Sequence, residues 1–201
     1  GDWSSDVCSS DLDNGVTFNG VSSVTSADVV ASNGIVHIVD AVIGLPSVVT
    51  FALADPNFSS LVQALTAYDY PQSFVGLLSI PAGSAPSPFT VFAPVNSGFE
   101  SLLDELGVNS LYDIDEQTLG AVLSYHVVVS VNQMSNTLSD GMVITTSLAQ
   151  ANPSIADLTF NVGDNGEGIL TDNNGRTSNI IAVDVQADNG IIHAIDTVVL
   201  P

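Results

Sequence analysis

The stretch that decides the fold reads Asn189-Gly190-Ile191-Ile192-His193-Ala194-Ile195-Asp196-Thr197-Val198-Val199-Leu200-Pro201. The same pattern occurs earlier, at Asn33–Pro46, with one residue inserted. At an offset of 156, residues 26–43 match residues 182–199 at nine of eighteen positions. A repeated motif indicates a repeated structural unit. An offset of this length is too long for a solenoid turn and fits a whole domain.

The stretch from 189 to 201 is predicted to be a strand buried inside its domain. Asn189-Gly190 is typical of a turn. Beyond it, successive side chains of an extended chain alternate between two faces, and we expect the strand to run from Ile191 to Leu200. Apolar residues fall on both faces, which is the pattern of a strand that is covered on both sides. One face carries Ile191, His193, Ile195, Thr197 and Val199, and the other carries Ile192, Ala194, Asp196 and Val198.

The composition argues against nucleic acid as a partner and against insertion into a membrane. The 201 residues are 45% hydrophobic, which is enough for a substantial core in one or two domains. Against 22 acidic residues the single basic residue is Arg176, and the net charge is -21. Such a charge repels polyanions, so nucleic acid is not an expected partner. No apolar run approaches the ~18 residues needed to cross a bilayer, so we expect no direct membrane insertion in this fragment.

The chain divides into three parts. Residues 1–12 have neither helical nor strand period, and we interpret them as a cloning scar or a sequence-assembly artefact. Residues 13–46 are β-rich, with an Asn-Gly turn at Asn19. Residues 47–201 hold the helical patterns and most of the predicted strands. One cysteine, Cys8, excludes an intramolecular disulfide.

From residue 47 onward, helical patterns come first and strand patterns follow, which predicts an α+β fold. Helices are expected over residues 48–54, 57–65, 96–106 and 115–126, with Asn57, Asn96 and Asp115 as N-terminal caps and Gly107 as a C-terminal stop. Residues 69–88 carry four prolines and are expected to form a loop. Strands are expected over residues 89–94, 127–129, 142–146, 158–162, 168–171, 179–185 and 191–200.

Three stretches stand in a recognisable order: Phe89-Thr90-Val91-Phe92-Ala93-Pro94 with Phe99 after it, then Leu123-Ser124-Tyr125-His126-Val127-Val128, then residues 189–201. In this order and at these spacings they resemble the fasciclin (FAS1) domain family. The residues that carry the family pattern are Thr90, Phe92, Ala93, Pro94, Phe99, Asn189, Gly190, His193, Asp196 and Pro201.

The resemblance implies an α+β fold, a compact β-sandwich or wedge with helices packed around it. On this reading residues 47–201 are a complete fasciclin-like domain. Residues 13–46 are then the C-terminal strands of a preceding fasciclin repeat or an N-terminal extension. The family implies secreted or surface-anchored adhesion proteins without catalytic activity, so we expect an extracellular location and no cofactor.

The family's proposed adhesion contacts are an Asp-Ile pair and the Tyr-His segment. Asp113-Ile114 and Tyr125-His126 match those residue types here. The alternative is that the apolar and aromatic members are core residues and Asp113 is solvated, because periodic apolar positions usually mean core.

The histidines and the acidic loops each allow a functional and a packing interpretation. His37, His126 and His193 could form a metal or acid/base site, but their apolar flanks favour packed residues with hydrogen-bonded rings. His193 and Asp196 could suggest half of a hydrolase triad, yet no Gly-x-Ser-x-Gly elbow is present and a strand would point the two to opposite faces. The acidic loops at 163–168 and 172–175 could bind a cation, although ordinary turns are favoured.

These observations predict a non-enzymatic secreted or cell-surface adhesion or matrix-interaction module, one of tandem fasciclin repeats. Its partner would be a cell-surface or matrix protein or a polysaccharide. The alternative is a carbohydrate-binding or cation-dependent accessory domain of a larger extracellular enzyme. Neither hypothesis assigns catalytic residues or a metal site.

Overall fold

The computed structural model describes residues 16–19, 21–152, 154 and 157–201, so the interpretation of residues 1–12 lies outside the described residues. The helices are α1 (Val48–Ala54), η1 (Pro56–Phe58), α2 (Ser59–Leu65), α3 (Phe74–Leu78), α4 (Asn96–Leu106), η2 (Leu111–Asp113), α5 (Glu116–Tyr125), η3 (Ser135–Thr137) and α6 (Ser147–Ala151). The strands are β1 (Thr17–Phe18), β2 (Ser22–Ala31), β3 (Gly34–Val39), β4 (Phe89–Pro94), β5 (Val127–Val129), β6 (Met142–Ile144), β7 (Leu158–Val162), β8 (Gly168–Thr171), β9 (Thr177–Ala187) and β10 (Gly190–Ile195).

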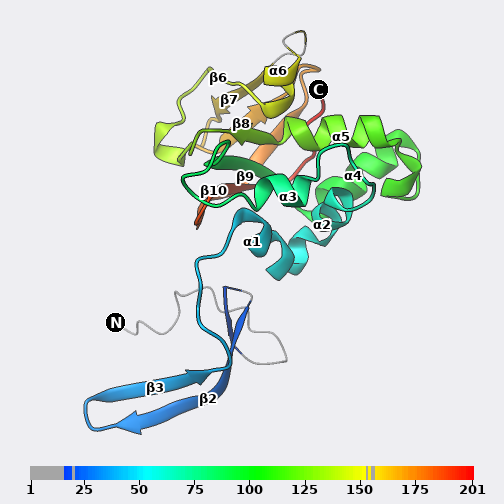
Figure 1. Ribbon diagram of the computed structural model, residues 1–201. Helices are drawn as coiled ribbons and strands as arrows, with labels where there is room; N and C mark the ends of the chain where they lie inside the picture. Colours follow the sequence, from blue (N-terminus) through cyan, green and yellow to red (C-terminus); the bar gives the residue numbers. More distant parts are fainter. Residues whose placement is uncertain (1–15, 20, 153, 155–156) are drawn as a thin grey trace.

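The domain is built on one mixed sheet of seven strands in the order β5-β4-β10-β9-β8-β7-β6. Strands β4 and β10 run parallel, and the other five neighbouring pairs run antiparallel. The sheet curves into a wedge, and helices α1, α2, α4 and α5 cluster on one side of it (Figure 1). The predicted α+β class is confirmed.

Strand β10 lies between two hydrophobic clusters. All six of its residues are buried. On one side Ile192 and the later Val198 join the cluster that α1, α2, α4 and α5 cover. On the other side Ile195 and Val199 join a second cluster with Phe92 and Tyr125. The predicted strand with two apolar faces is therefore confirmed.

The predicted end of that strand is wrong, because β10 stops at Ile195 and not at Leu200. Asp196 explains the stop. Its Oδ1 accepts the Asn179 N–H at 2.8 Å and its Oδ2 accepts the Asn179 side-chain amide at 2.7 Å. Because the Asp196 carboxylate accepts the backbone N–H of Asn179 on β9, that group is not available to a backbone carbonyl of β10 and the strand pairing ends. The chain then bends at 196–197.

Asn189 and Gly190 fix the start of β10 to the rest of the domain. The Asn189 side chain is buried and accepts the Val48 N–H at 3.0 Å, which ties it to the first turn of α1. Its amide donates to the carbonyls of Leu78 at 2.7 Å and Ile80 at 2.9 Å, at the end of α3. A Cβ on Gly190 would lie 2.3 Å from the Phe89 carbonyl oxygen, so the parallel contact with β4 requires glycine.

Two of the predicted helix caps are confirmed and two are wrong. Asp115 caps α5 by accepting the Thr118 N–H, and Gly107 ends α4 with a φ of 67°. Asn57 lies inside η1, which Asp55 caps instead. Asn96 is the first residue of α4 but does not cap it, because its side chain accepts the Ser60 N–H of α2 at 2.9 Å.

The segment 69–88 is mostly irregular, as predicted, but it contains the short helix α3, which Ser73 caps by accepting the Gly76 N–H. Buried Phe74 and Leu78 attach this helix to the main cluster. Helix α3 thereby places Tyr70 and Pro71 beside α5, where they help to line a groove.

Strands β1, β2 and β3 form a separate three-stranded sheet that stands apart from the domain (Figure 1). Its apolar residues are largely exposed, with Val30 at 82% and Ile35 at 61%. The Asp188 N–H donates to the Pro46 carbonyl at 2.8 Å, where the linker enters the domain. Among the described residues, no helix is both long and apolar enough to span a bilayer.

Candidate functional site

The Tyr-His motif lies at the end of α5, inside the protein. Tyr125 is the last helical residue and His126 is the C-terminal cap. Their exposed fractions are 0% and 3%. Helix α5 buries Leu119, Val122 and Leu123 along the same face, so its sequence pattern directs the motif into the core.

His126 is a neutral imidazole with both ring nitrogens occupied. Its Nδ1–H donates to the Val122 carbonyl at 2.7 Å, and its Nε2 accepts the Val199 N–H at 3.2 Å. These two partners assign the tautomer. Burial lowers the pKa of His126 to about 4, against a smaller opposing effect of the Val122 carbonyl. The side chain therefore links α5 to the C-terminal segment without carrying charge.

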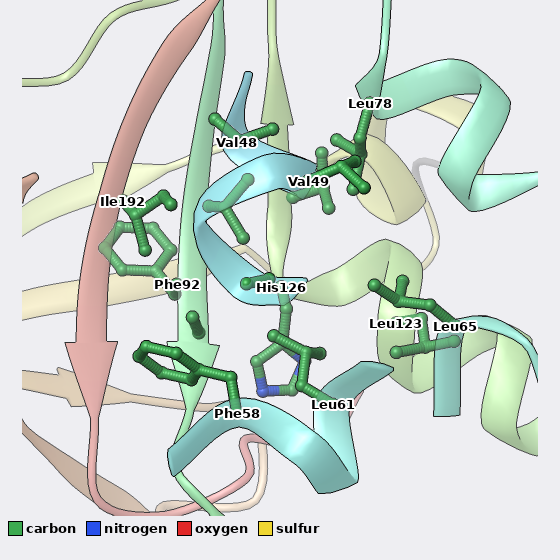
Figure 2. A pocket seen from close by; sticks show the side chains of 14 residues that line it. Val48, Val49, Phe58, Leu61, Leu65, Leu78, Phe92, Leu123, His126 and Ile192 are labelled. Carbon is green, nitrogen blue, oxygen red and sulfur yellow. The ribbon is translucent and has the colours of Figure 1, made fainter. Parts of the chain in front are cut away.

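A small cavity adjoins this histidine. Figure 2 shows the His126 ring beside Leu61, with Leu65, Leu123 and Phe58 farther along the lining of the cavity. The cavity has a volume of about 30 Å³ and an almost wholly apolar lining. A water needs two or more polar partners, and the ring nitrogens of His126 are already used. We interpret this space as a packing defect of the core and not as a ligand site.

Asp113 and Ile114 lie in and after η2, at the opposite end of α5. Ile114 is 7% exposed and belongs to the main cluster. Asp113 is exposed, and its Oδ2 accepts the Asn109 N–H at 3.2 Å. Of the four residues proposed as adhesion contacts, only Asp113 presents its side chain to solvent. Ile114, Tyr125 and His126 occupy the core positions that the packing alternative gives them.

Asp113 borders a surface that sequence reasoning missed. Tyr68, Tyr70 and Tyr112 form edge-to-face ring contacts, with centroids 5.9 Å apart for Tyr68–Tyr70 and 6.5 Å for Tyr68–Tyr112. The Tyr68 hydroxyl donates to the Ile114 carbonyl at 2.6 Å and also lies 3.0 Å from the Tyr112 carbonyl. Tyr112 itself is 56% exposed. These contacts join the segment after α2 to η2.

A groove of about 560 Å³ runs next to this aromatic group, between the segment 70–77 and α5. Tyr70, Pro71 and Phe74 line one wall, and Asp115 and Glu116 line the other. Hydrogen bonds from the Thr118 hydroxyl and N–H lower the pKa of Asp115, so this exposed carboxylate stays ionised. We call the set Tyr68, Tyr70, Tyr112, Asp113, Asp115 and Glu116 the acidic-aromatic surface.

His193 and Asp196 do not form half of a hydrolytic triad. His193 Nδ1 accepts the Asp184 N–H at 3.4 Å, and its Nε2–H donates to the Gln133 carbonyl at 2.8 Å. Asp196 is engaged elsewhere, by Asn179. Burial raises the pKa of Asp196, but hydrogen bonds from Asn179, Thr197 and Ser178 outweigh it and the net shift is downward. Both side chains hold backbone together.

The two acidic loops are turns held by their own carboxylates. Glu167 accepts the Asn165 N–H at 3.0 Å. Asp172 is buried, and its oxygens accept the N–H groups of Asn174, Arg176 and Leu200 at 2.9 to 3.0 Å. Within the part of the chain that the structure describes, no three His, Cys, Asp or Glu side chains gather into a metal-binding group.

Comparison with known proteins decides the family, since the fasciclin domain model matches residues 5–46 and 56–201. This chain belongs to the fasciclin family. An uncharacterised protein of Synechocystis is 32% identical over 78% of this chain and 98% of its own length. Human periostin is 28% identical over 94% of this chain, which spans only 20% of periostin.

A solved structure shows the same fold. The FAS1 domain pair of the insect cell adhesion molecule fasciclin I aligns with a TM-score of 0.61 and 24% identity, over 91% of this chain and 61% of that one. The resemblance inferred from three motifs is thus confirmed, and the fold is the FAS1 fold. That solved relative is a cell adhesion molecule.

Proposed function

We propose that this chain is a non-enzymatic extracellular adhesion or matrix-interaction module, secreted or anchored at a cell surface. The observation that carries the proposal is the fasciclin fold itself, which the chain shares with an insect cell adhesion molecule. His126, His193 and Asp172 support a module without chemistry, because their polar side-chain atoms bond backbone groups.

We place the contact with the partner on the acidic-aromatic surface. Aromatic side chains give a large contact area at low entropic cost, and a rim of carboxylates selects basic or hydroxyl-rich groups. Tyr112 and Asp113 are exposed there, and the groove beside Tyr70 can admit a side chain or a sugar ring. The partner is a cell-surface or matrix protein or a polysaccharide.

The test is adhesion of the 201-residue chain to cells and to immobilised matrix proteins and polysaccharides. Asp113→Asn should weaken binding about tenfold, which corresponds to the loss of one useful contact. Asp164→Asn is the matched control, since Asp164 is also an exposed acid and lies in the turn between β7 and β8. Equal binding by both variants and the unmodified chain would remove Asp113 from the site. Binding to no cell or matrix material would contradict the proposed function.

A polysaccharide partner with a calcium requirement would instead favour the accessory-domain alternative. Calcium would then raise the melting temperature, because a ligand specific to the folded state stabilises it. An unchanged melting temperature together with chelator-resistant binding favours adhesion.

We also propose that the domain is one of at least two tandem fasciclin repeats. Two facts support this arrangement: the family model matches residues 5–46 separately from 56–201, and the solved relative that covers most of this chain is a domain pair.

A further inference from the structure

The N-terminal hairpin, β2–β3, repeats the geometry of the C-terminal hairpin, β9–β10. All five residue pairs of β2–β3 recur in β9–β10 at the offset of 156, and both ladders shift register at the same places. Asp28 and Asp184 occupy the same bulge, with φ of 58° and 59°. The corresponding pairs are Val24–Val39 and Ile180–Ile195, Ser26–Ile38 and Ala182–Ala194, Val29–Val36 and Val185–Ile192, Val30–Ile35 and Gln186–Ile191, and Ala31–Gly34 and Ala187–Gly190.

The hydrogen bonds that involve side chains recur as well. In each hairpin a buried serine donates to a carbonyl nineteen residues later, Ser22 to Ala41 at 2.7 Å and Ser178 to Thr197 at 2.8 Å. The aspartates at the bulges donate their N–H groups to histidine Nδ1, Asp28 to His37 and Asp184 to His193. Asp40 accepts the Ser23 N–H as Asp196 accepts that of Asn179. The two hairpins therefore have the same local structure, although only half of the residues in 26–43 and 182–199 are identical.

The two hairpins differ in what covers them. In the C-terminal hairpin, β10 pairs with β4 along its second edge and is buried throughout. In the N-terminal hairpin, the described residues place no strand on the second edge of β3, and Val36 and Ile38 are each 51% exposed. Long apolar strands with a free edge pair readily with another strand.

Three residues of the N-terminal hairpin lack the contacts that their counterparts make. A Cβ on Gly34 would meet nothing within 4 Å, whereas one on Gly190 would lie 2.3 Å from a β4 carbonyl. Asn33 is exposed, whereas Asn189 holds α1 and the end of α3. His37 is exposed, whereas His193 Nε2 donates to Gln133. Strand β3 and the turn before it therefore carry the counterparts of the residues with which β10 contacts its domain, but in β3 these residues have no domain to contact within the described part of the chain.

We propose that the N-terminal hairpin is a docking surface for the body of a preceding fasciclin repeat, whose counterpart of β4 pairs in parallel with the free edge of β3. Gly34 then faces that strand, Asn33 caps the repeat's first helix, and Ile35, Val36, Ile38 and Val39 fill its core. The proposal rests on the tandem arrangement. It follows from the hairpin geometry and is independent of which partner the protein binds.

The offset provides a direct test. Residues 47–177, which lack the β9–β10 hairpin, are joined in front of residues 22–201, so that Ser22 takes the place of Ser178. In this duplicated chain β3 should close the first body. The amides of β3 should then exchange with solvent at least tenfold more slowly than in the 201-residue chain, where the edge is free. The second repeat in the same molecule serves as the folding control.

Point variants sharpen the test. Gly34→Ala should leave the 201-residue chain unchanged but lower the first melting transition of the duplicated chain by roughly 5 °C or more. Gly44→Ala is the matched control, because a Cβ there also meets nothing within 4 Å and Gly44 lies outside the strand.

The proposal is overturned if the β3 amides of the duplicated chain exchange with solvent as fast as those of the 201-residue chain. It is also overturned if Gly34→Ala and Gly44→Ala give the duplicated chain the same first melting temperature. Concentration-dependent protection of β3 in the 201-residue chain would make a second copy the occupant instead of a preceding repeat. None of these measurements involves adhesion, so they fail or succeed separately from the proposed function.

Discussion

Gly190 shows how a single missing side chain can be required for the fold. A Cβ at this position would lie 2.3 Å from the Phe89 carbonyl oxygen and 2.9 Å from the Phe89 nitrogen, and both are backbone atoms that cannot rotate away. We expect Gly190→Ala to reduce the free energy of unfolding by about 3 kcal/mol, through displacement of β10 from β4. Urea denaturation measures the change.

Gly34→Ala is the matched control for that experiment, since it makes the same substitution in the equivalent turn of an uncovered hairpin. Its unfolding free energy should stay within about 0.5 kcal/mol of the unmodified chain. A similar loss in both variants would mean that glycine is needed for the turn and not for the contact with β4.

His126 makes stability depend on pH below neutrality. Its pKa is about 4 in the folded protein and 6.5 for the unperturbed side chain, because burial disfavours the imidazolium. Between these values the unfolded chain binds a proton that the folded chain does not, so stability falls as pH falls, and it is fully retained above about 6.5. The slope is about 1.4 kcal/mol per pH unit, with a total near 3 kcal/mol.

The measurement is the unfolding free energy of the unmodified chain and of His126→Gln between pH 5 and 7. Glutamine keeps a polar side chain but does not titrate, so its curve should be flatter by the histidine contribution. Since most carboxylates are already ionised above pH 5, they contribute little to the difference. Parallel curves for the two proteins would show that the pKa of His126 is the same in the folded and the unfolded chain, and would contradict the expected shift.

At the level of the elements, local signals predicted what local forces determine. Asp115 marks the start of α5 and Gly107 marks the end of α4, and each acts through groups within a few residues. Both were predictable from sequence. Asn96 looked like a cap for α4, but its side chain reaches Ser60 of α2, thirty-six residues away. A capping residue can satisfy any nearby helix terminus, and only the tertiary arrangement selects which one.

The N-terminal hairpin gives a prediction about independent folding. A fragment that begins at Pro46 keeps the carbonyl that accepts the Asp188 N–H. It lacks β1, β2 and β3, and the side chains of β2 and β3 are largely exposed. The melting temperature of 46–201 should stay within about 3 °C of that of the full chain. Because exposed apolar strands promote association, the shortened protein should also remain monomeric to higher concentration.

Calorimetry and light scattering test these two statements. An unfolded 46–201 fragment would show that the hairpin stabilises the domain in spite of its exposure, and would also contradict the hairpin's assignment to a preceding repeat.

On the scale of the whole molecule, the motifs predicted the family better than the site. Tyr125 and His126 could be placed on a helix from their spacing, but their burial depends on the sheet that α5 covers. The acidic-aromatic surface brings Tyr68 next to Tyr112, forty-four residues later in the chain. A hint was present, because three of the four tyrosines lie between residues 68 and 112, close to Asp113. Their contact itself is a product of tertiary packing.

The net charge of -21 gives the last prediction. Arg176 is the single basic residue, and it pairs with Glu105 and lies 3.8 Å from Asp172, so attraction offsets little of the repulsion among 22 acids. Salt at 1 M shortens the screening length to about 3 Å and should weaken that repulsion in the compact state. The melting temperature should therefore rise by about 5 °C between 0.05 and 1 M sodium chloride. Arg176→Gln separates the two effects because it removes the ion pairs. The variant should melt lower at low salt, and its melting temperature should rise with salt at least as steeply as that of the unmodified chain. A melting temperature that falls with salt in both proteins would show that repulsion among the acidic residues does not limit the stability of this fold.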